Sequence, residues 1–149
     1  MKPKIFLGAD HAGLELKEDV KKYLLKQGYD VEDKGAYSFD KNDDYPDFIK
    51  SVAKEVAKNK ECRGIVFGAS GQGEAITANR VKGVRAALYY GGNQEIAILS
   101  RTHNNANILS LGARFVSKDE AVKAVKLWLG TDFSNEKRHI RRIKKIDNS

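Results

Sequence analysis

A glycine-rich segment that ends in an acid is the part of this sequence best suited to bind an anion. It runs from Gly68 to Glu74, between a short apolar run and a helical pattern. Small residues allow backbone N–H groups to converge on an anion or a developing oxyanion, and the dipole of the following helix reinforces them. The segment has neither the Gly-Lys-Ser/Thr of a Walker A loop nor the GxGxxG spacing of a dinucleotide loop. It predicts a site for a polar or anionic group; the alternative is a tight turn whose glycines are purely geometric.

Glu74 falls in the first turn of the helix expected after this segment. The helix dipole favours a carboxylate there, and a capping role is the simpler interpretation. A bound sugar that enclosed the carboxylate would remove it from water and raise its basicity, which suits a general base. The two effects oppose each other, so the sequence indicates a candidate base without the direction of its pKa shift.

Two further polar groups lie next to predicted strands. Asp10 and His11 follow the first apolar run and suit contact with hydroxyls, a ring oxygen or a phosphate, although Asp10 could equally be a helix N-cap. The run 101–107 places His103 among asparagines, where an imidazole could exchange protons with a sugar oxygen, although a lone histidine in a loop is more often solvated. The three histidines and their neighbours have no recognisable metal-ligand spacing, and we expect no metal and no other cofactor.

The last helical pattern, at about 134–146, has one basic face. Arg138 and Arg142, four residues apart, can clamp a phosphate with two planar guanidinium groups. The alternative is that cations simply stabilise the negative end of the helix, which suits Lys144 and Lys145.

Strand-like runs alternate with helical patterns along the whole chain, which predicts a parallel sheet built through crossover helices. Strands are expected at 5–8, 29–31, 64–67, 85–89 and 108–111, and helices at 14–27, 45–59, 74–81, 94–101, 118–129 and 134–146. The expected fold is α/β, a three-layer αβα, Rossmann-like, doubly wound sheet of five parallel strands. In such sheets ligands bind beyond the carboxyl ends of the strands. Asp10 and His11, the segment from Asp43 to Pro46, the glycine-rich segment and Arg114 would meet there.

Length and composition indicate a single domain spanning 1–149. Of the residues, 41% are hydrophobic and 32% charged, and no apolar run approaches the roughly 18 residues of a membrane span. The first residues do not form a secretory signal, so we expect a cytoplasmic protein with no membrane partner. Cys62 is the only cysteine, which excludes an internal disulfide.

The formal net charge of +7 is concentrated near the end of the chain. Six cations lie in the last helical pattern, namely Lys137, Arg138, Arg141, Arg142, Lys144 and Lys145, and the rest of the chain is close to neutral. Nucleic-acid binding would need interleaved aromatic stacking platforms, which are absent from this pattern. We therefore expect no nucleic-acid partner.

Taken in order along the chain, these motifs resemble the family of ribose-5-phosphate isomerase B and galactose-6-phosphate isomerase. The matching segments are Gly8 to Gly13, Asp44 to Asp47, Gly71 to Glu74 with Ala78 and Asn79, Arg85 with Ala86, His103 with Asn104, Gly112 to Arg114, and Arg138 with His139 and Arg142. Each is weak alone, but together they cover almost the whole chain. The resemblance implies interconversion of an aldose phosphate and a ketose phosphate without metal or cofactor, through ring opening and a cis-enediolate.

The resemblance also implies roles for individual residues. Glu74 matches the base that moves the proton between C1 and C2, and His103 matches the proton donor that assists ring opening. The other matches are substrate contacts: Asp10 and His11; Ala69, Ser70, Gly71, Gln72 and Gly73 through backbone N–H groups; Asn104 to a hydroxyl; Arg114, Arg138 and Arg142 to the phosphate; and Tyr45 as a pocket wall.

Two positions depart from the family pattern. Many members have a catalytic cysteine just before the loop, where this chain has Gly68, and Cys62 is six residues too early to replace it. The chain thus resembles the branch in which a glutamate, here Glu74, transfers the proton. Ala69 stands where relatives commonly have glycine, and its Cβ would restrict a positive φ.

The resemblance leaves assembly and substrate as expectations. The family's pocket is shared by two subunits, so we expect a homodimer or a dimer of such dimers. Ribose 5-phosphate is the preferred substrate, and allose 6-phosphate and galactose 6-phosphate stay open, because a pocket discriminates one carbon by only about 1–3 kcal/mol. A noncatalytic phosphosugar-binding protein would keep the arginines and the loop but would need neither Glu74 nor His103.

Overall fold

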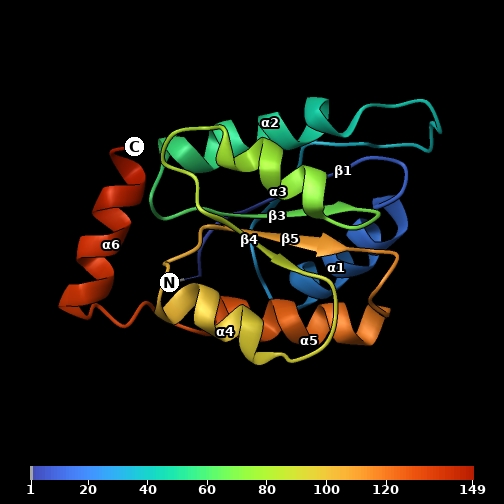
Figure 1. Cartoon of the computed structure of the whole chain (residues 1–149). Helices are drawn as coiled ribbons and strands as arrows, with labels where there is room; N and C mark the ends of the chain where they lie inside the picture. The colour runs from blue at the N-terminus through green and yellow to red at the C-terminus, as the bar shows by residue number, and fades with distance from the viewer. Residues whose placement is uncertain (1) are drawn as a thin grey trace.

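The computed structural model describes residues 2–149 and contains one sheet of five parallel strands (Figure 1). The strands are β1 (Ile5–Ala9), β2 (Val31–Asp33), β3 (Arg63–Gly68), β4 (Ala86–Tyr89) and β5 (Ile108–Gly112), in the spatial order β2-β1-β3-β5-β4. In the register, Ile65 of β3 lies opposite Leu7 of β1 and Leu109 of β5. The chain moves outward from β1 to one side and then returns to build the other, so the expected doubly wound sheet is confirmed.

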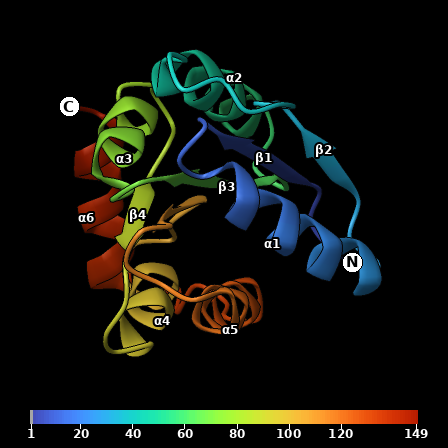
Figure 2. The same cartoon turned by 90° about the vertical axis from the view of Figure 1, so that its right-hand side faces the viewer.

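The helices complete three layers. They are α1 (Leu14–Lys26), α2 (Tyr45–Lys58), α3 (Gln72–Asn79), α4 (Glu95–Thr102), α5 (Lys118–Leu129) and α6 (Lys137–Asp147). Figure 2 shows α2 and α3 over one face of the sheet and α1, α4 and α5 over the other. No helix within residues 2–149 combines the length and the apolar character needed to cross a membrane.

Apolar side chains pack on both faces of the sheet. Leu7 and Phe67 pack with Trp128 of α5 on one face, and Val66 packs with Val52 of α2 on the other. All five side chains are fully buried, as expected for strands covered on both sides. Each contributes about 1.5–3 kcal/mol of apolar burial, which fixes the strand ends that carry the polar residues.

Two elements begin two or more residues later than the sequence pattern indicates. β2 starts at Val31 because the backbone N–H of Tyr29 still donates to the carbonyl of Leu24 and closes the end of α1, at 3.0 Å. α6 starts at Lys137 because Asn135 has φ 60° and Glu136 is extended.

α6 belongs to neither helical layer and lies across the amino ends of the strands (Figure 1). His139 and Ile143 are its buried side chains, whereas Arg138, Arg141 and Arg142 are exposed. The predicted amphipathic character of this helix is therefore confirmed, with its basic face toward solvent.

Candidate active site

The glycine-rich loop lies at the carboxyl edge of the sheet and is held by its neighbours. Gly71 has φ +77°, the left-handed conformation that glycine favours, and directly precedes α3. Its carbonyl oxygen accepts a hydrogen bond from the buried hydroxyl of Ser110 on β5, at 2.7 Å. The backbone N–H of Arg114 donates to the carbonyl of Ala69 at 2.9 Å. Ala69 itself does not have a positive φ, so an alanine fits this position without backbone strain.

Glu74 turns its carboxylate back over the loop into the space beside Gly68. The residue is only 4% exposed. A Cβ added at Gly68 would lie 2.1 Å from Cδ and 2.2 Å from both carboxylate oxygens of Glu74. Carbon contacts are optimal at about 3.5–4.0 Å, so this carboxylate and any side chain at position 68 exclude each other. The absence of a cysteine side chain at position 68 is thus what leaves room for the Glu74 carboxylate.

The protein itself encloses Glu74, before any substrate does. Burial raises the pKa of this carboxyl, the negative charge of Asp10 adds to the rise, and hydrogen bonds from the backbone N–H groups of Glu74 and Gly71 oppose it. The sequence left open the direction of the pKa shift of Glu74, and in the structure the pKa is raised. A carboxylate with a raised pKa is a stronger base than an exposed glutamate, which suits proton abstraction near neutral pH.

Asp10, Tyr45 and Arg114 lie at the same edge. Asp10 is buried directly after β1, and its Oδ1 accepts a hydrogen bond from the backbone N–H of Gly13 at 3.2 Å, so it does hold the start of α1. Tyr45 begins α2, and its hydroxyl lies 2.5 Å from the position that a Cβ of Gly73 would take, so the phenol rests directly on the loop. Arg114 is exposed.

We call the predicted site residues at the carboxyl edge of the sheet the carboxyl-edge group. Its members are Asp10, His11, Tyr45, Ala69, Ser70, Gly71, Gln72, Gly73, Glu74 and Arg114.

His11 forms a close pair with Asp43, a residue to which the sequence motifs assigned no role. Nδ1 of His11 lies 2.7 Å from Oδ1 of Asp43, and the backbone N–H of His11 donates to the same oxygen at 3.2 Å. The Asp43 side chain is only 9% exposed. The hydrogen bond to Asp43 raises the pKa of His11, and the charges of Asp10 and Asp40 add to it. The only signal for Asp43 in the sequence was its position after the second predicted strand.

We expect Asp43→Asn to lower the pKa of His11. The pair favours the imidazolium, so it stabilises the fold fully below the ordinary histidine pKa of 6.5 and stops doing so as the pH rises through the raised value. The variant should therefore lose most stability below pH 6.5. An NMR titration of the three histidines measures the pKa directly. Asp40→Asn is the control, because exposed Asp40 acts only through its charge and should lower the pKa less. Equal shifts in both variants would contradict the role of the pair.

Asp10, His11 and Asp43 are also near enough to one another to surround a cation, with one ligand atom from each within 4.8 Å of the others. The hydrogen bond between His11 and Asp43 already accounts for this closeness. The three residues therefore give no reason to assign a metal.

Four predicted site residues lie at the opposite edge of the sheet. His103 caps the C-terminus of α4 and Asn104 follows it, before β5 begins, while Arg138 and Arg142 belong to α6. We call these four the amino-edge group. The six residues of β3 span roughly 20 Å at about 3.3 Å per residue, so the strands separate the two groups within one chain.

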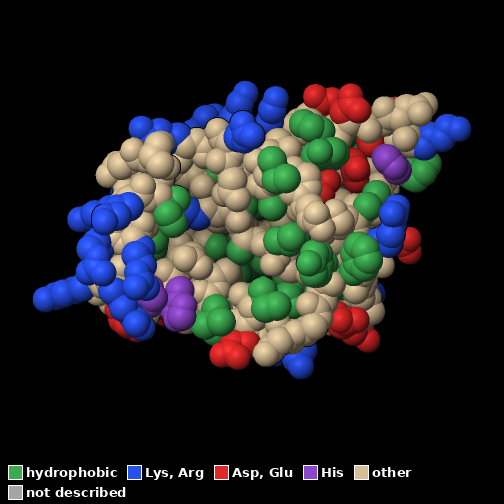
Figure 3. Space-filling model, in the orientation of Figure 1, with side chains coloured by type: hydrophobic (Ala, Val, Ile, Leu, Met, Phe, Trp, Pro, Cys, Tyr) green, Lys and Arg blue, Asp and Glu red, His purple; other side chains and the backbone are tan. Residues whose placement is uncertain are grey.

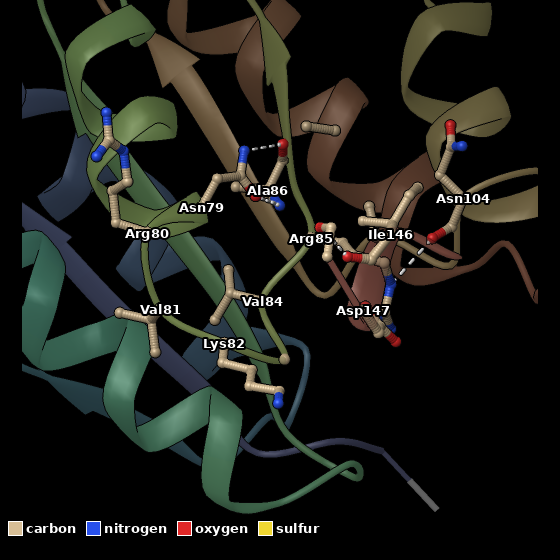
Figure 4. Close-up of a pocket in the computed structure, with 14 residues that line it drawn as sticks. Asn79, Arg80, Val81, Lys82, Val84, Arg85, Ala86, Asn104, Ile146 and Asp147 are labelled. Atoms are coloured by element: carbon tan, nitrogen blue, oxygen red, sulfur yellow. Dashed lines mark hydrogen bonds and ion pairs between the residues drawn. The ribbon is translucent and has the colours of Figure 1, made fainter. Parts of the chain in front are cut away.

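Asn104 lines a cavity of about 530 Å³ between the start of β4 and the end of α6 (Figure 4). Arg85 crosses its wall. Nη1 of Arg85 donates to both carboxylate oxygens of Asp147 at 3.1 Å, and Nε donates to the carbonyl oxygen of Asn104 at 3.1 Å. This side chain ties α6 and the Asn104 turn to the amino end of the sheet.

The ring of His103 stacks on that of His139 in α6. The ring centroids are 4.3 Å apart and the planes differ by 17°. His139 is buried, and its Nε2 has no hydrogen-bond partner within residues 2–149. Burial lowers the pKa of His139, and the neighbouring His103 lowers it further. The buried His139 ring therefore supports the His103 ring, a contact that the sequence did not indicate.

The chain matches the family model described as Ribose/Galactose Isomerase over residues 5–146. It is 41% identical over 140 residues to ribose-5-phosphate isomerase B of Mycolicibacterium paratuberculosis, which covers 94% of this chain and 87% of that protein. The matched range includes both the carboxyl-edge and the amino-edge groups.

Two solved structures resemble the whole fold. One is a ribose 5-phosphate isomerase from Thermotoga maritima, with a TM-score of 0.93, 44% identity and 100% coverage of both chains. The other is ribose-5-phosphate isomerase B from Mycoplasma genitalium with bound ribulose-5-phosphate, with a TM-score of 0.93, 43% identity, and coverage of 97% of this chain and 94% of that one. The resemblance inferred from the motifs is confirmed at the level of sequence and of fold.

Proposed function

The chain belongs to the ribose/galactose isomerase family, and on this premise we propose that it interconverts ribose 5-phosphate and ribulose 5-phosphate. The observation that carries the proposal is the buried Glu74 carboxylate, with its raised pKa, beside a preformed loop. The relatives' names and the ribulose-5-phosphate bound to the Mycoplasma genitalium protein support a five-carbon substrate. An enzyme with this activity would act in the pentose phosphate pathway, in the cytoplasm.

Glu74 is the proton carrier in this proposal. Its carboxylate removes the proton from C2 of the open-chain aldose, and the electron pair forms the C1=C2 double bond of the enediolate while the negative charge moves to O1. The hydroxyl proton of O2 then passes to O1, and the same carboxyl returns its proton to C1 as C2 becomes the ketone carbonyl. Backbone N–H groups of the loop from Ala69 to Gly73 stabilise the negative charge that develops on the oxygens. General acid–base catalysis contributes roughly 10²- to 10⁴-fold and one oxyanion donor roughly 3–4 kcal/mol, so both elements are needed.

The remaining residues open the ring and hold the phosphate. His103 donates a proton during ring opening, and Asn104 contacts a hydroxyl. Arg114, Arg138 and Arg142 hold the phosphate, together with His11, whose imidazolium form is favoured by the hydrogen bond to Asp43. Asp10 contacts the sugar, and Tyr45 forms a wall above Gly73.

We further propose that one site is assembled from two chains. The carboxyl-edge and amino-edge groups lie at opposite ends of the strands, so a substrate of five carbons cannot reach both within one chain. β4 is an edge strand, and exposed apolar side chains lie around it, namely Ile76, Tyr90, Ile96, Leu99 and Phe115. Figure 3 shows hydrophobic side chains on the side of the molecule where β4 lies. Exposed apolar patches and unpaired edges of this kind are typical of subunit interfaces. A two-fold homodimer, alone or paired into a tetramer, would bring the amino-edge group of one chain to the carboxyl-edge group of the other.

A heterodimer of two inactive chains should recover activity. Glu74→Gln and His103→Ala each inactivate both sites of a homodimer. In a heterodimer one site carries both substitutions and the other carries neither, so we expect about half the wild-type kcat per dimer. Co-expression with two affinity tags isolates the heterodimer, and a tagged wild-type/Glu74→Gln heterodimer is the control. An inactive heterodimer beside an active control would show that each chain holds a complete site.

The proposed activity is tested by assaying the purified protein on ribose 5-phosphate, allose 6-phosphate and galactose 6-phosphate, with and without a chelator. We expect the highest kcat/KM for ribose 5-phosphate and no effect of the chelator. Absence of turnover on all three would favour a noncatalytic phosphosugar-binding protein, and higher turnover of a hexose phosphate would move the assignment to that sugar.

A further inference from the structure

A second cavity, of about 810 Å³, lies at the amino edge of the sheet. Its walls include the turn before β3, the segment after α5, and the inward side of α6 through Ile143 and Asp147. None of the residues to which we assign a role in the isomerisation lines it.

Cations outnumber acids around this cavity. The lining cations are Lys2, Lys4, Lys60, Arg63, Arg85 and Arg101, and the lining acids are Glu61, Asp132 and Asp147. Asp147 is paired with Arg85 at 3.1 Å, and Lys4 is paired with Glu32, outside the cavity, at 3.1 Å. Within residues 2–149, neither Arg63 nor Arg101 has a carboxylate oxygen within 4.0 Å.

Arg101 is 4% exposed, yet all its partners are neutral. Nε donates to the carbonyl of Thr131 at 3.1 Å, and Nη1 donates to Oδ1 of Asn105 at 2.9 Å and to the carbonyl of Ala106 at 2.7 Å. A guanidinium has five N–H donors, and these bonds leave those of Nη2 without an acceptor in the described chain.

Arg63 is held even more weakly. Its Nη1 reaches the carbonyl oxygens of Cys62 and Lys60 only at 3.3 and 3.4 Å, and no other nitrogen of its guanidinium has a partner within residues 2–149. Burial lowers the pKa of Arg101 to about 10, and the charges of Arg63 and Arg85 add to the fall. Burial lowers the pKa of Arg63 as well. The two guanidinium groups are thus close enough to repel each other, and the acids that oppose this effect, Asp132 for both and Glu61 for Arg63, are not in direct contact with them.

We propose that this cavity binds a small multivalent phosphate-type oxyanion between Arg63 and Arg101. Planar guanidinium groups with free donors match phosphate oxygens, and a bound anion would be in direct contact with both groups, which Asp132 and Glu61 are not. The volume exceeds that of one phosphate, and Lys60 at the rim adds a third cation. No aromatic residue lines the cavity, so it offers no surface on which a nucleobase could stack. These features favour a compact polyanion such as pyrophosphate over a nucleotide.

Because the cavity lies under α6, a bound anion should also stabilise the folded protein. α6 carries Arg138 and Arg142, and its Ile143 and Asp147 form part of the cavity wall. Because an anion bound only by the folded protein stabilises it, pyrophosphate should raise the melting temperature.

Isothermal titration with pyrophosphate, at constant ionic strength and without phosphate buffer, tests the proposal. The background is Arg142→Gln, in which the proposed substrate clamp is weakened. We expect one pyrophosphate per chain and at least tenfold weaker binding when Arg63→Gln is added. Arg63→Lys should recover part of the affinity, and Arg80→Gln, an exposed arginine at the other amino-edge cavity, should change nothing.

Arg63→Gln alone should keep wild-type turnover, since Arg63 belongs to neither site group, and this activity shows that the variant is folded. Absence of binding in the Arg142→Gln background, or binding that Arg63→Gln leaves unchanged, would overturn the proposal. Neither result depends on which sugar phosphate the enzyme converts.

Discussion

Glu74→Gln should lower kcat for ribose 5-phosphate by at least about 10²- to 10⁴-fold while changing KM only a few-fold. Glutamine has the shape of glutamate and its amide oxygen can still accept the backbone hydrogen bonds at this position, so the pocket keeps its form. It cannot accept and return a proton. The change therefore removes the chemical step and leaves binding largely intact.

The same substitution should stabilise the protein at pH values above the raised pKa of Glu74. A carboxyl whose pKa is raised on folding is stabilising below its ordinary pKa of 4.5, and that contribution disappears as the pH rises through the raised value. Above its raised pKa wild-type Glu74 is a buried charge, and glutamine removes that charge. Thermal unfolding between pH 4 and 8 should show Glu74→Gln gaining on the wild type as the pH rises.

Glu15→Gln is the matched control, because Glu15 also lies in the first turn of a helix, α1, but is exposed. It should change neither turnover nor the pH dependence of stability. Near-normal turnover of Glu74→Gln would mean that another residue is the base. Equal effects of the two variants would mean that Glu74 only caps its helix.

The fold was predictable because its signals are local. Apolar runs such as 64–67 became buried strands, and periodic patterns became helices within a few residues of their expected ends. The environment of Lys17 could not be predicted from local patterns. Lys17 looks like a solvated lysine on a helix, yet it is fully buried and donates to both oxygens of Asp33 at 2.7 and 2.8 Å. Only the packing of α1 beside β2 brings the two together, and no local pattern contains that information.

The division of the site between two edges follows from topology. In a parallel sheet every strand-to-helix loop lies at the carboxyl edge and every helix-to-strand loop at the amino edge. Glu74 follows β3, whereas His103 precedes β5, so the order of the elements already places them at opposite ends. The contacts that support members of each group could not be predicted from the sequence. The pair of His11 with Asp43 and the stack of His103 on His139 each join segments that are 32 or more residues apart.

Gly68→Ala should disable the enzyme almost as strongly as the loss of Glu74 itself. The added Cβ would lie 2.1–2.2 Å from the carboxyl atoms, and the carboxylate must leave its enclosed position. We expect kcat to fall at least about 10²-fold as the base loses its placement. Overpacking of a buried site typically costs about 1–3 kcal/mol, which a denaturant titration would detect. Gly130→Ala is the control, because Gly130 has a negative φ of −86° and the nearest atom to its added Cβ would be the carbonyl oxygen of Lys126, at 3.2 Å, which needs a shift of a few tenths of an ångström.

A double-mutant cycle identifies the cause of that loss. If the clash is with the Glu74 side chain, Gly68→Ala should cost much less stability in a Glu74→Ala background than in the wild type, because the space is then empty. Equal costs in both backgrounds would place the strain in the backbone of the loop instead. A large coupling energy would mean that a side chain at position 68 and the Glu74 carboxylate compete for the same space, so that only one of them fits. The glycine is then as necessary to this catalytic arrangement as the glutamate, although it contributes only its missing side chain.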